Sequence, residues 1–155
     1  MNEVNNRYSE QDLLEALYIW VTDYNKLPTH REISADNRMP THHTYINRFG
    51  SIKNAFDAAG LSDINNMSML HDLVRDFISY NEEHARIDNI VVDFTLDYYG
   101  TIIAIDIVNI DKFNVSDIIK KRILTYRKSC VEAYGMEYVR INNLLDMQKL
   151  ENYRR

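Results

Sequence analysis

The sequence predicts an α+β protein in which a helical module is followed by a mixed sheet with helices packed on it. Through residues 9–61, apolar residues recur every three or four positions, which is typical of amphipathic helices. After residue 83 the period changes to two, and turn residues separate the strand-like segments. The chain of 155 residues is long enough to bury a core, and its composition excludes collagen-like, disordered and disulfide-rich proteins.

Each of the four helices predicted in the first part follows a residue that favours the N-cap position. These caps are Ser9, Thr29, Thr41 and Ser51. The first helix ends before Pro28, because the residue that precedes a proline disfavours helical geometry. Gly50 and Gly60 end the third and fourth helices. We therefore expect residues 8–61 to form a helix-turn-helix-like domain of four short helices.

The second domain is expected at residues 68–155, after a polar linker at residues 63–68. Its predicted order is αβββαβα. The elements are a helix around residues 70–78, strands at 84–87, 90–98 and 101–109, a helix at 115–134, a strand at 136–141 and a helix at 143–153. Asp88-Asn89 and Tyr99-Gly100 are residues that favour the two tight turns between the first three strands.

The formal net charge of −5, from 18 Lys and Arg against 23 Asp and Glu, is unfavourable for binding the phosphates of a nucleic acid. The distribution of charge matters more than its sum. Basic side chains gather in residues 26–53, together with three histidines, and again in residues 112–128. Each of these zones is either a solvated helix face or a surface that contacts nucleic acid.

The predicted hairpin places two acidic residues opposite each other. A turn at Tyr99-Gly100 pairs position 98 with position 101, which puts Val92, Phe94 and Leu96 opposite Ile107, Ile105 and Ile103 on an apolar face. On the other face, Asp93 lies opposite Asp106 with Cβ atoms about 4.5–5.5 Å apart. The repulsion between the carboxylates is relieved by a shared proton, by a divalent cation such as Mg²⁺ or Mn²⁺, or by exposure to water at the end of the sheet.

The first part of the chain resembles the homing endonuclease associated repeat. The matching residues are Tyr8 to Leu17, Leu27-Pro28-Thr29, Arg31-Glu32-Ile33, Thr44-Tyr45, Arg48-Phe49-Gly50-Ser51, Asn54-Ala55-Phe56 and Ala58-Ala59-Gly60-Leu61. This resemblance implies a DNA-binding module whose recognition helix runs from His42 to Arg48. The expected DNA contacts are Arg31, Arg38, Thr41, His42, His43, Tyr45, Asn47, Arg48 and Lys53. Asn47 and Arg48 are residue types that read adenine and guanine edges.

Residues 68–141 resemble the core of the PD-(D/E)XK nuclease superfamily. Val92-Asp93-Phe94 matches the strand with the first acid, and Ile105-Asp106-Ile107-Val108 matches the (D/E)XK strand. The resemblance implies that Asp93 and Asp106 bind a metal ion, with Glu82 (or Glu83) as a third carboxylate. Val108 occupies the position of the motif's lysine, so the cation would come from Lys120 or Lys121 on the following helix, with Lys112 as a further candidate.

Two functions follow from these resemblances. The first is a sequence-specific, Mg²⁺-dependent DNA endonuclease of homing type, which would act as a homodimer on double-stranded DNA and use no small-molecule cofactor. The second is a DNA-binding regulator or antagonist, of phage or mobile-element origin, that keeps the fold without catalysis. A protein-binding adaptor is a third alternative. Without a secretion signal, a membrane segment or a second cysteine to pair with Cys130, we expect a cytoplasmic protein.

Overall fold

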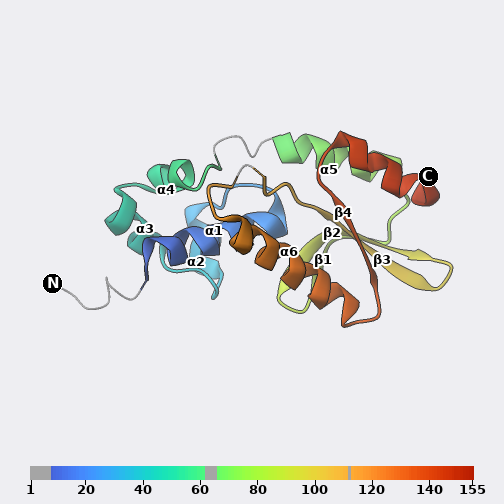
Figure 1. The fold of residues 1–155 in the computed structure, drawn as a ribbon, viewed down its shortest axis with the longest axis horizontal. Coiled ribbons are helices and arrows are strands. Elements are labelled where there is room, and N and C mark those ends of the chain that lie inside the picture. Colours follow the sequence, from blue (N-terminus) through green and yellow to red (C-terminus); the bar gives the residue numbers. More distant parts are fainter. Residues whose placement is uncertain (1–7, 62–65, 112) are drawn as a thin grey trace.

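The computed structural model describes residues 8–61, 66–111 and 113–155. Figure 1 shows helices α1 to α4 extending to one side of the β-sheet. The helices of the first part are α1 (Glu10–Tyr24), α2 (His30–Ala35), α3 (His42–Phe49) and α4 (Ile52–Ala58). The second part contains α5 (Asn66–Phe77), β1 (Glu82–Ile87), β2 (Ile90–Tyr98), β3 (Thr101–Ile107), α6 (Asp117–Glu132), β4 (Glu137–Ile141) and η2 (Leu144–Tyr153). The predicted α+β class is confirmed.

The four predicted N-caps of the helical module are confirmed. The side chains of Ser9 and Thr29 each accept a hydrogen bond from the backbone N–H three residues later. The side chains of Asp12 and Glu32 accept one from the backbone N–H of the cap residue, which completes two capping boxes. Thr41 and Ser51 cap α3 and α4 in the same way, without the returned bond. Each cap satisfies a backbone N–H at the helix start that has no partner within the helix.

The strands lie in the order β1-β2-β3-β4. β1, β2 and β3 are antiparallel neighbours, whereas β4 is parallel to β3, because α6 crosses over between them. The predicted register of the β2–β3 hairpin is confirmed from the pair Tyr98–Thr101 to the pair Phe94–Ile105. Tyr99 and Gly100 both have positive φ angles, 52° and 91°, as a two-residue hairpin turn of the favoured hand requires.

The register prediction is wrong beyond Phe94. The β2–β3 pairs end at Phe94–Ile105, and the N–H of Ile107 donates to Oδ2 of Asp93 at 2.6 Å. Val92 therefore leaves the apolar face that it was expected to share with Phe94 and packs in a different cluster, with Ala104 and the residues of α6. The Asp93 carboxylate thus accepts the hydrogen bond that a backbone carbonyl oxygen would accept if the β2–β3 ladder continued.

Other details of the elements also differ from the prediction. β3 ends at Ile107 instead of residue 109, and the last helix is a 3₁₀ helix. Of the expected linker, residues 63–65 lie outside the described residues, and residues 66–68 belong to α5. Lys112, a candidate cation, also lies outside the described part of the chain.

The helical module and the sheet share one hydrophobic core. This core joins Leu13, Leu17 and Val21 of α1 to Phe94 and Ile105 of the sheet. Figure 1 shows α5 and η2 on one side of the sheet and α6 on the other. A second, smaller cluster packs strand residues against Cys130 and Val131 of α6, so the thiol is buried. Across the described residues, every helix is too short or too polar to span a bilayer.

Candidate functional site

The predicted acidic residues lie in the protein interior, where the β2–β3 ladder ends. Asp106 is fully buried, and Arg127 of α6 binds it in a bidentate pair, with Nε 2.6 Å from Oδ2 and Nη2 2.8 Å from Oδ1. The hydroxyl of Tyr138 on β4 also donates to Oδ2 at 2.6 Å. Nη1 of the same arginine lies 2.6 Å from Oδ1 of Asp23, in the last turn of α1. One guanidinium thus bridges two buried carboxylates, and Arg38 supplies a second cation to Asp23 at 2.8 Å.

Asp93 is fully buried as well, and it has a different set of partners. Its Oδ1 accepts a hydrogen bond from the side-chain amide of Asn25 at 2.7 Å and lies 2.9 Å from Nδ1 of His71. Its Oδ2 accepts the bond from the backbone of Ile107. Asn25 is the C-cap of α1 and has a left-handed backbone, with φ 56°. The end of α1 is therefore bonded directly to the sheet.

The expected arrangement of the acid pair needs correction. Asp93 bonds to His71 of α5, whereas Asp106 bonds to Arg127 of α6, and these two helices lie on opposite sides of the sheet (Figure 1). The repulsion between the carboxylates is compensated by the arginine and the histidine, which the sequence analysis did not consider. Both carboxylates are fully buried, which excludes the expected alternative of exposure to water at the end of the sheet.

The acid pair does not fit a Mg²⁺ ion. Mg²⁺ requires near-octahedral oxygen ligands and usually keeps several of its waters. All four carboxylate oxygens of Asp93 and Asp106 already accept bonds from protein groups, and neither residue has accessible surface. Among the described residues, the buried side-chain oxygens without a hydrogen bond belong to Asp23 and Asn142, and that of Asp23 lies 2.8 Å from Arg38.

The other residues expected in a catalytic centre lie apart from the acid pair. Lys120 donates to the carbonyl oxygen of Asp111 at 3.0 Å, in the first turn of α6 and about 10 Å along the helix from Arg127. Lys121 is exposed, and so is Glu82 at the start of β1. The described structure gives none of these three side chains a bond to Asp93 or Asp106.

The residues that do contact the acid pair were missed, although the sequence contains a signal for some of them. Arg127 follows Ile123 by four positions and precedes Cys130 by three, so it falls on the buried stripe of α6. His71 precedes the buried Val74 by three positions in the same way. A charged residue within an apolar helical stripe indicates a buried ion pair. Asp23 follows the buried Trp20 of α1 by three positions and carries the same signal. Asn25 lies past the end of that helix and carries none, because only the packing of α1 against β2 brings it to the network.

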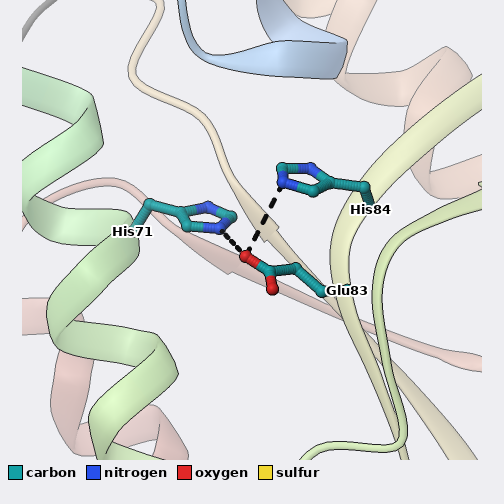
Figure 2. Close-up of side chains that lie close together, drawn as sticks. All are labelled: His71, Glu83 and His84. Atoms are coloured by element: carbon teal, nitrogen blue, oxygen red, sulfur yellow. Dashed lines mark hydrogen bonds and ion pairs between the residues drawn. The ribbon is translucent and has the colours of Figure 1, made fainter.

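The network reaches the protein surface through Glu83 (Figure 2). Its Oε1 lies 2.9 Å from Nε2 of His71, 3.6 Å from Nε2 of His84 and 2.6 Å from Nη2 of Arg75. The imidazole of His71 stacks between Phe94 and His84, with ring centroids 4.7 and 5.1 Å apart. The side chains become more exposed outward, from 8% for His71 to 49% for His84.

The charges of this network shift the pKa values of its members. Burial opposes protonation of His71, but its hydrogen bonds to Asp93 and Glu83 outweigh burial and raise its pKa. The hydrogen bond from Arg75, with that from His71, lowers the pKa of Glu83 to about 2 against the opposing effect of burial. Burial raises the pKa of Asp93, and the nearby Asp106 raises it further, against the bonds from His71 and Ile107.

Two of the expected DNA contacts have structural roles. Tyr45 is fully buried, and its hydroxyl donates to the carbonyl oxygen of Leu13 at 2.7 Å, so it packs in the core and is not available to DNA. Arg38 lies 2.8 Å from a carboxylate oxygen of both Asp23 and Asp36, and it donates to the carbonyl oxygen of Asn89 at 2.7 Å. This arginine therefore connects the helical module to the β1–β2 turn.

The remaining expected contacts lie on the surface of the helical module. Thr41 caps α3 and shares a hydrogen bond with Thr44, and the ring of His42 stacks on His30 with centroids 4.0 Å apart. Arg48 donates to the carbonyl oxygen of Tyr8. The other members of the set are exposed; they are Arg31, His43, Asn47 and Lys53, the last paired with Asp57.

Comparison with known proteins supports the assignment of the first part. The family model for the homing endonuclease associated repeat matches residues 8–62. No curated protein and no solved structure matches the chain. The resemblance of residues 68–141 to the PD-(D/E)XK superfamily stays a prediction. The helical module of this protein is therefore similar in sequence to the homing endonuclease associated repeat.

Proposed function

We propose that this protein binds double-stranded DNA through its helical module and does not hydrolyse it. The observation that carries the proposal is the neutralisation of Asp93 and Asp106 by His71 and Arg127 inside the core. This choice favours the non-catalytic regulator or antagonist over the Mg²⁺- or Mn²⁺-dependent endonuclease. The sheet domain then serves as the scaffold that holds α1 and, with it, the DNA-binding surface.

The surface of α3 supports the DNA-binding part of the proposal. His43, Ile46 and Asn47 are exposed at a helical spacing of three and four, so they lie on one face of the helix. Tyr45 anchors the opposite face to α1. A helix anchored on one side, with exposed side chains that include two polar ones on the other, has the form of a recognition helix that reads base edges in the major groove. The match to a repeat associated with homing endonucleases points the same way.

The energetics of the acid pair support the absence of catalysis. A metal ion at Asp106 would have to displace a bidentate arginine from a site without accessible surface. Breaking a buried ion pair is strongly unfavourable, because the released partner keeps an uncompensated charge in the interior. Hydrolysis also needs a site for water and for the scissile phosphate. The homodimer was predicted from double-strand cleavage, and a non-catalytic protein does not require it.

The proposal is tested by selecting bound duplexes from a random library and measuring their affinity by fluorescence anisotropy. Asn47→Ala should weaken binding to the selected duplex by about 1–3 kcal/mol, as expected for the loss of a base contact. Asn152→Ala, an exposed amide on η2, is the matched control and should bind as the unmodified protein does.

Two results would overturn the proposal. The first is the absence of any salt-sensitive affinity for duplex DNA, which would favour the protein-binding adaptor. The second is cleavage of the selected duplex in Mg²⁺ or Mn²⁺ that is lost in Asp106→Asn, which would establish the endonuclease. We expect intact DNA under both conditions.

A further inference from the structure

We propose that His71, Glu83 and His84 form a binding site for one divalent transition-metal ion of the Zn²⁺ type. The three residues come from α5 and β1 and converge on Oε1 of Glu83 at the surface end of the buried network (Figure 2). The proposal does not depend on DNA binding.

The distances between the ligand atoms fit a tetrahedral ion. Bonds of about 2.0–2.1 Å from Zn²⁺ to nitrogen or oxygen place two tetrahedral ligands about 3.4 Å apart. Oε1 of Glu83 lies 2.9 Å from Nε2 of His71 and 3.6 Å from Nε2 of His84, which brackets that value. One ligand atom from each of the three residues lies within 4.8 Å of the others.

A carboxylate already orients the buried imidazole. Nδ1 of His71 lies 2.9 Å from Asp93, which leaves Nε2 to point toward Glu83. Asp93 is itself held by Asn25 and by the backbone of Ile107. Histidines that bind metals usually donate their other ring nitrogen to such a carboxylate, which fixes the ring and increases the basicity of the ligand.

The backbone at His84 is a second, independent indication. His84 has φ 54° within β1, a left-handed conformation that is uncommon for a residue other than glycine and that costs energy in a strand. At this residue the ring lies nearly parallel to that of His71, with 8° between the planes. Such conformations persist where the surroundings impose them, and they are frequent at ligand sites.

The set of ligands indicates the type of site. Two imidazoles and one carboxylate form a recurring Zn²⁺ set that leaves a fourth position for water. The exposure of the His84 and Glu83 side chains, 49% and 25%, gives this position access to solvent. The preference for nitrogen over oxygen ligands separates this site from a Mg²⁺ centre.

Arg75 competes with the ion for Glu83. Its Nε and Nη2 lie 3.1 and 2.6 Å from Oε1, so an ion must displace the guanidinium. The side chain of Arg75 is partly exposed and has a second partner in Asp72, at 2.8 Å, to which it stays bonded after displacement. We therefore expect Arg75→Ala to bind the ion more tightly than the unmodified chain.

The test is a titration of the full chain with Zn²⁺ in competition with a chromophoric chelator. We expect one ion per chain and a loss of affinity of at least about tenfold in His84→Asn, since even the residues that orient a metal ligand contribute about 10–100-fold. His84 is half exposed, so this variant should fold. Circular dichroism checks the fold of each variant.

His42→Asn is the matched control, because His42 stacks on His30 in the other pair of histidine rings and could bind Zn²⁺ adventitiously. It should leave the affinity unchanged. The proposal is overturned if the chain binds no Zn²⁺, if the loss occurs in His42→Asn instead of His84→Asn, or if Arg75→Ala fails to increase the affinity. A Co²⁺ titration gives a second readout, with visible absorption bands of tetrahedral type that require His84.

Discussion

Replacing Arg127 by methionine removes the cation that pairs with the buried Asp106 and keeps a side chain of similar length. Arg127 is 2% exposed and lies 2.6 Å from both Asp23 and Asp106. Breaking a buried ion pair from one side typically costs about 3–5 kcal/mol, because the remaining charge has no partner in a poorly polarisable interior. In a chain of this size, each kcal/mol lowers Tm by about 2–4 °C. We expect Arg127→Met to lower Tm by about 6–20 °C.

Urea unfolding at pH 7, followed by circular dichroism, measures this loss of free energy. Lys128→Met is the matched control, because Lys128 is the neighbour of Arg127 on α6, is exposed and forms a loose pair with Glu132 at 3.9 Å. This variant should change the free energy of unfolding by at most about 0.5 kcal/mol. The double variant Arg127→Met/Asp106→Asn should lose less than the sum of the two single variants, because it no longer buries an unpaired Asp106. A loss below about 1 kcal/mol in Arg127→Met would refute the reasoning.

Three further predictions concern individual groups. The pKa of His71 should lie above the ordinary value of 6.5, whereas that of His42, which burial and the neighbouring histidines lower, should lie below it; NMR titration of the ring protons would measure both. The stabilisation by protonated His71 is then complete below pH 6.5 and is lost as the pH rises through the raised pKa. A reversed order of the two titration midpoints would contradict the described contacts. Glu83, with its pKa lowered to about 2, should stabilise the fold fully above pH 4.5 and progressively less as the pH falls toward 2. Glu83→Gln should therefore lose less unfolding free energy across that pH range than the unmodified protein, and equal slopes of unfolding free energy against pH would contradict this. Tyr45→Phe should lower the free energy of unfolding by about 0.5–1.5 kcal/mol in urea titrations and leave DNA affinity unchanged. A loss of DNA affinity without a loss of stability would instead indicate that Tyr45 contacts DNA.

Local features of the fold were predictable because they depend on interactions between near neighbours in sequence. The caps at Ser9, Thr29, Thr41 and Ser51 each satisfy backbone groups three residues away. The turn at Tyr99-Gly100 set the register as far as Phe94, because backbone twist and side-chain alternation agree there. The prediction failed beyond Phe94, where the side chain of Asp93 replaces a backbone acceptor, a choice that alternation does not encode.

The sequence predicted which acidic residues need a compensating charge, but it did not predict which groups contact them. The pair Asp93 and Asp106 was correctly expected to need compensation, because like charges on adjacent strands repel. Lys120 and Lys121 were expected to provide a cation, yet Arg127 does so from two turns further along α6. Which cation reaches the pair depends on the face that α6 turns to the sheet.

The amino-acid sequence alone determined the helical module, the order of the helices and strands along the chain and the first five pairs of the β2–β3 hairpin, since these follow from hydrophobic periodicity, caps and turn residues. Only the tertiary structure decided that α1 ends against β2 and that Asp23 and Asn25 thereby enter a network with Arg127 and His71. The bonded partners in that network are separated by 21 to 104 positions along the chain. Contacts over such distances arise from the packing of whole elements, and a buried charge is bonded to whichever group that packing brings near.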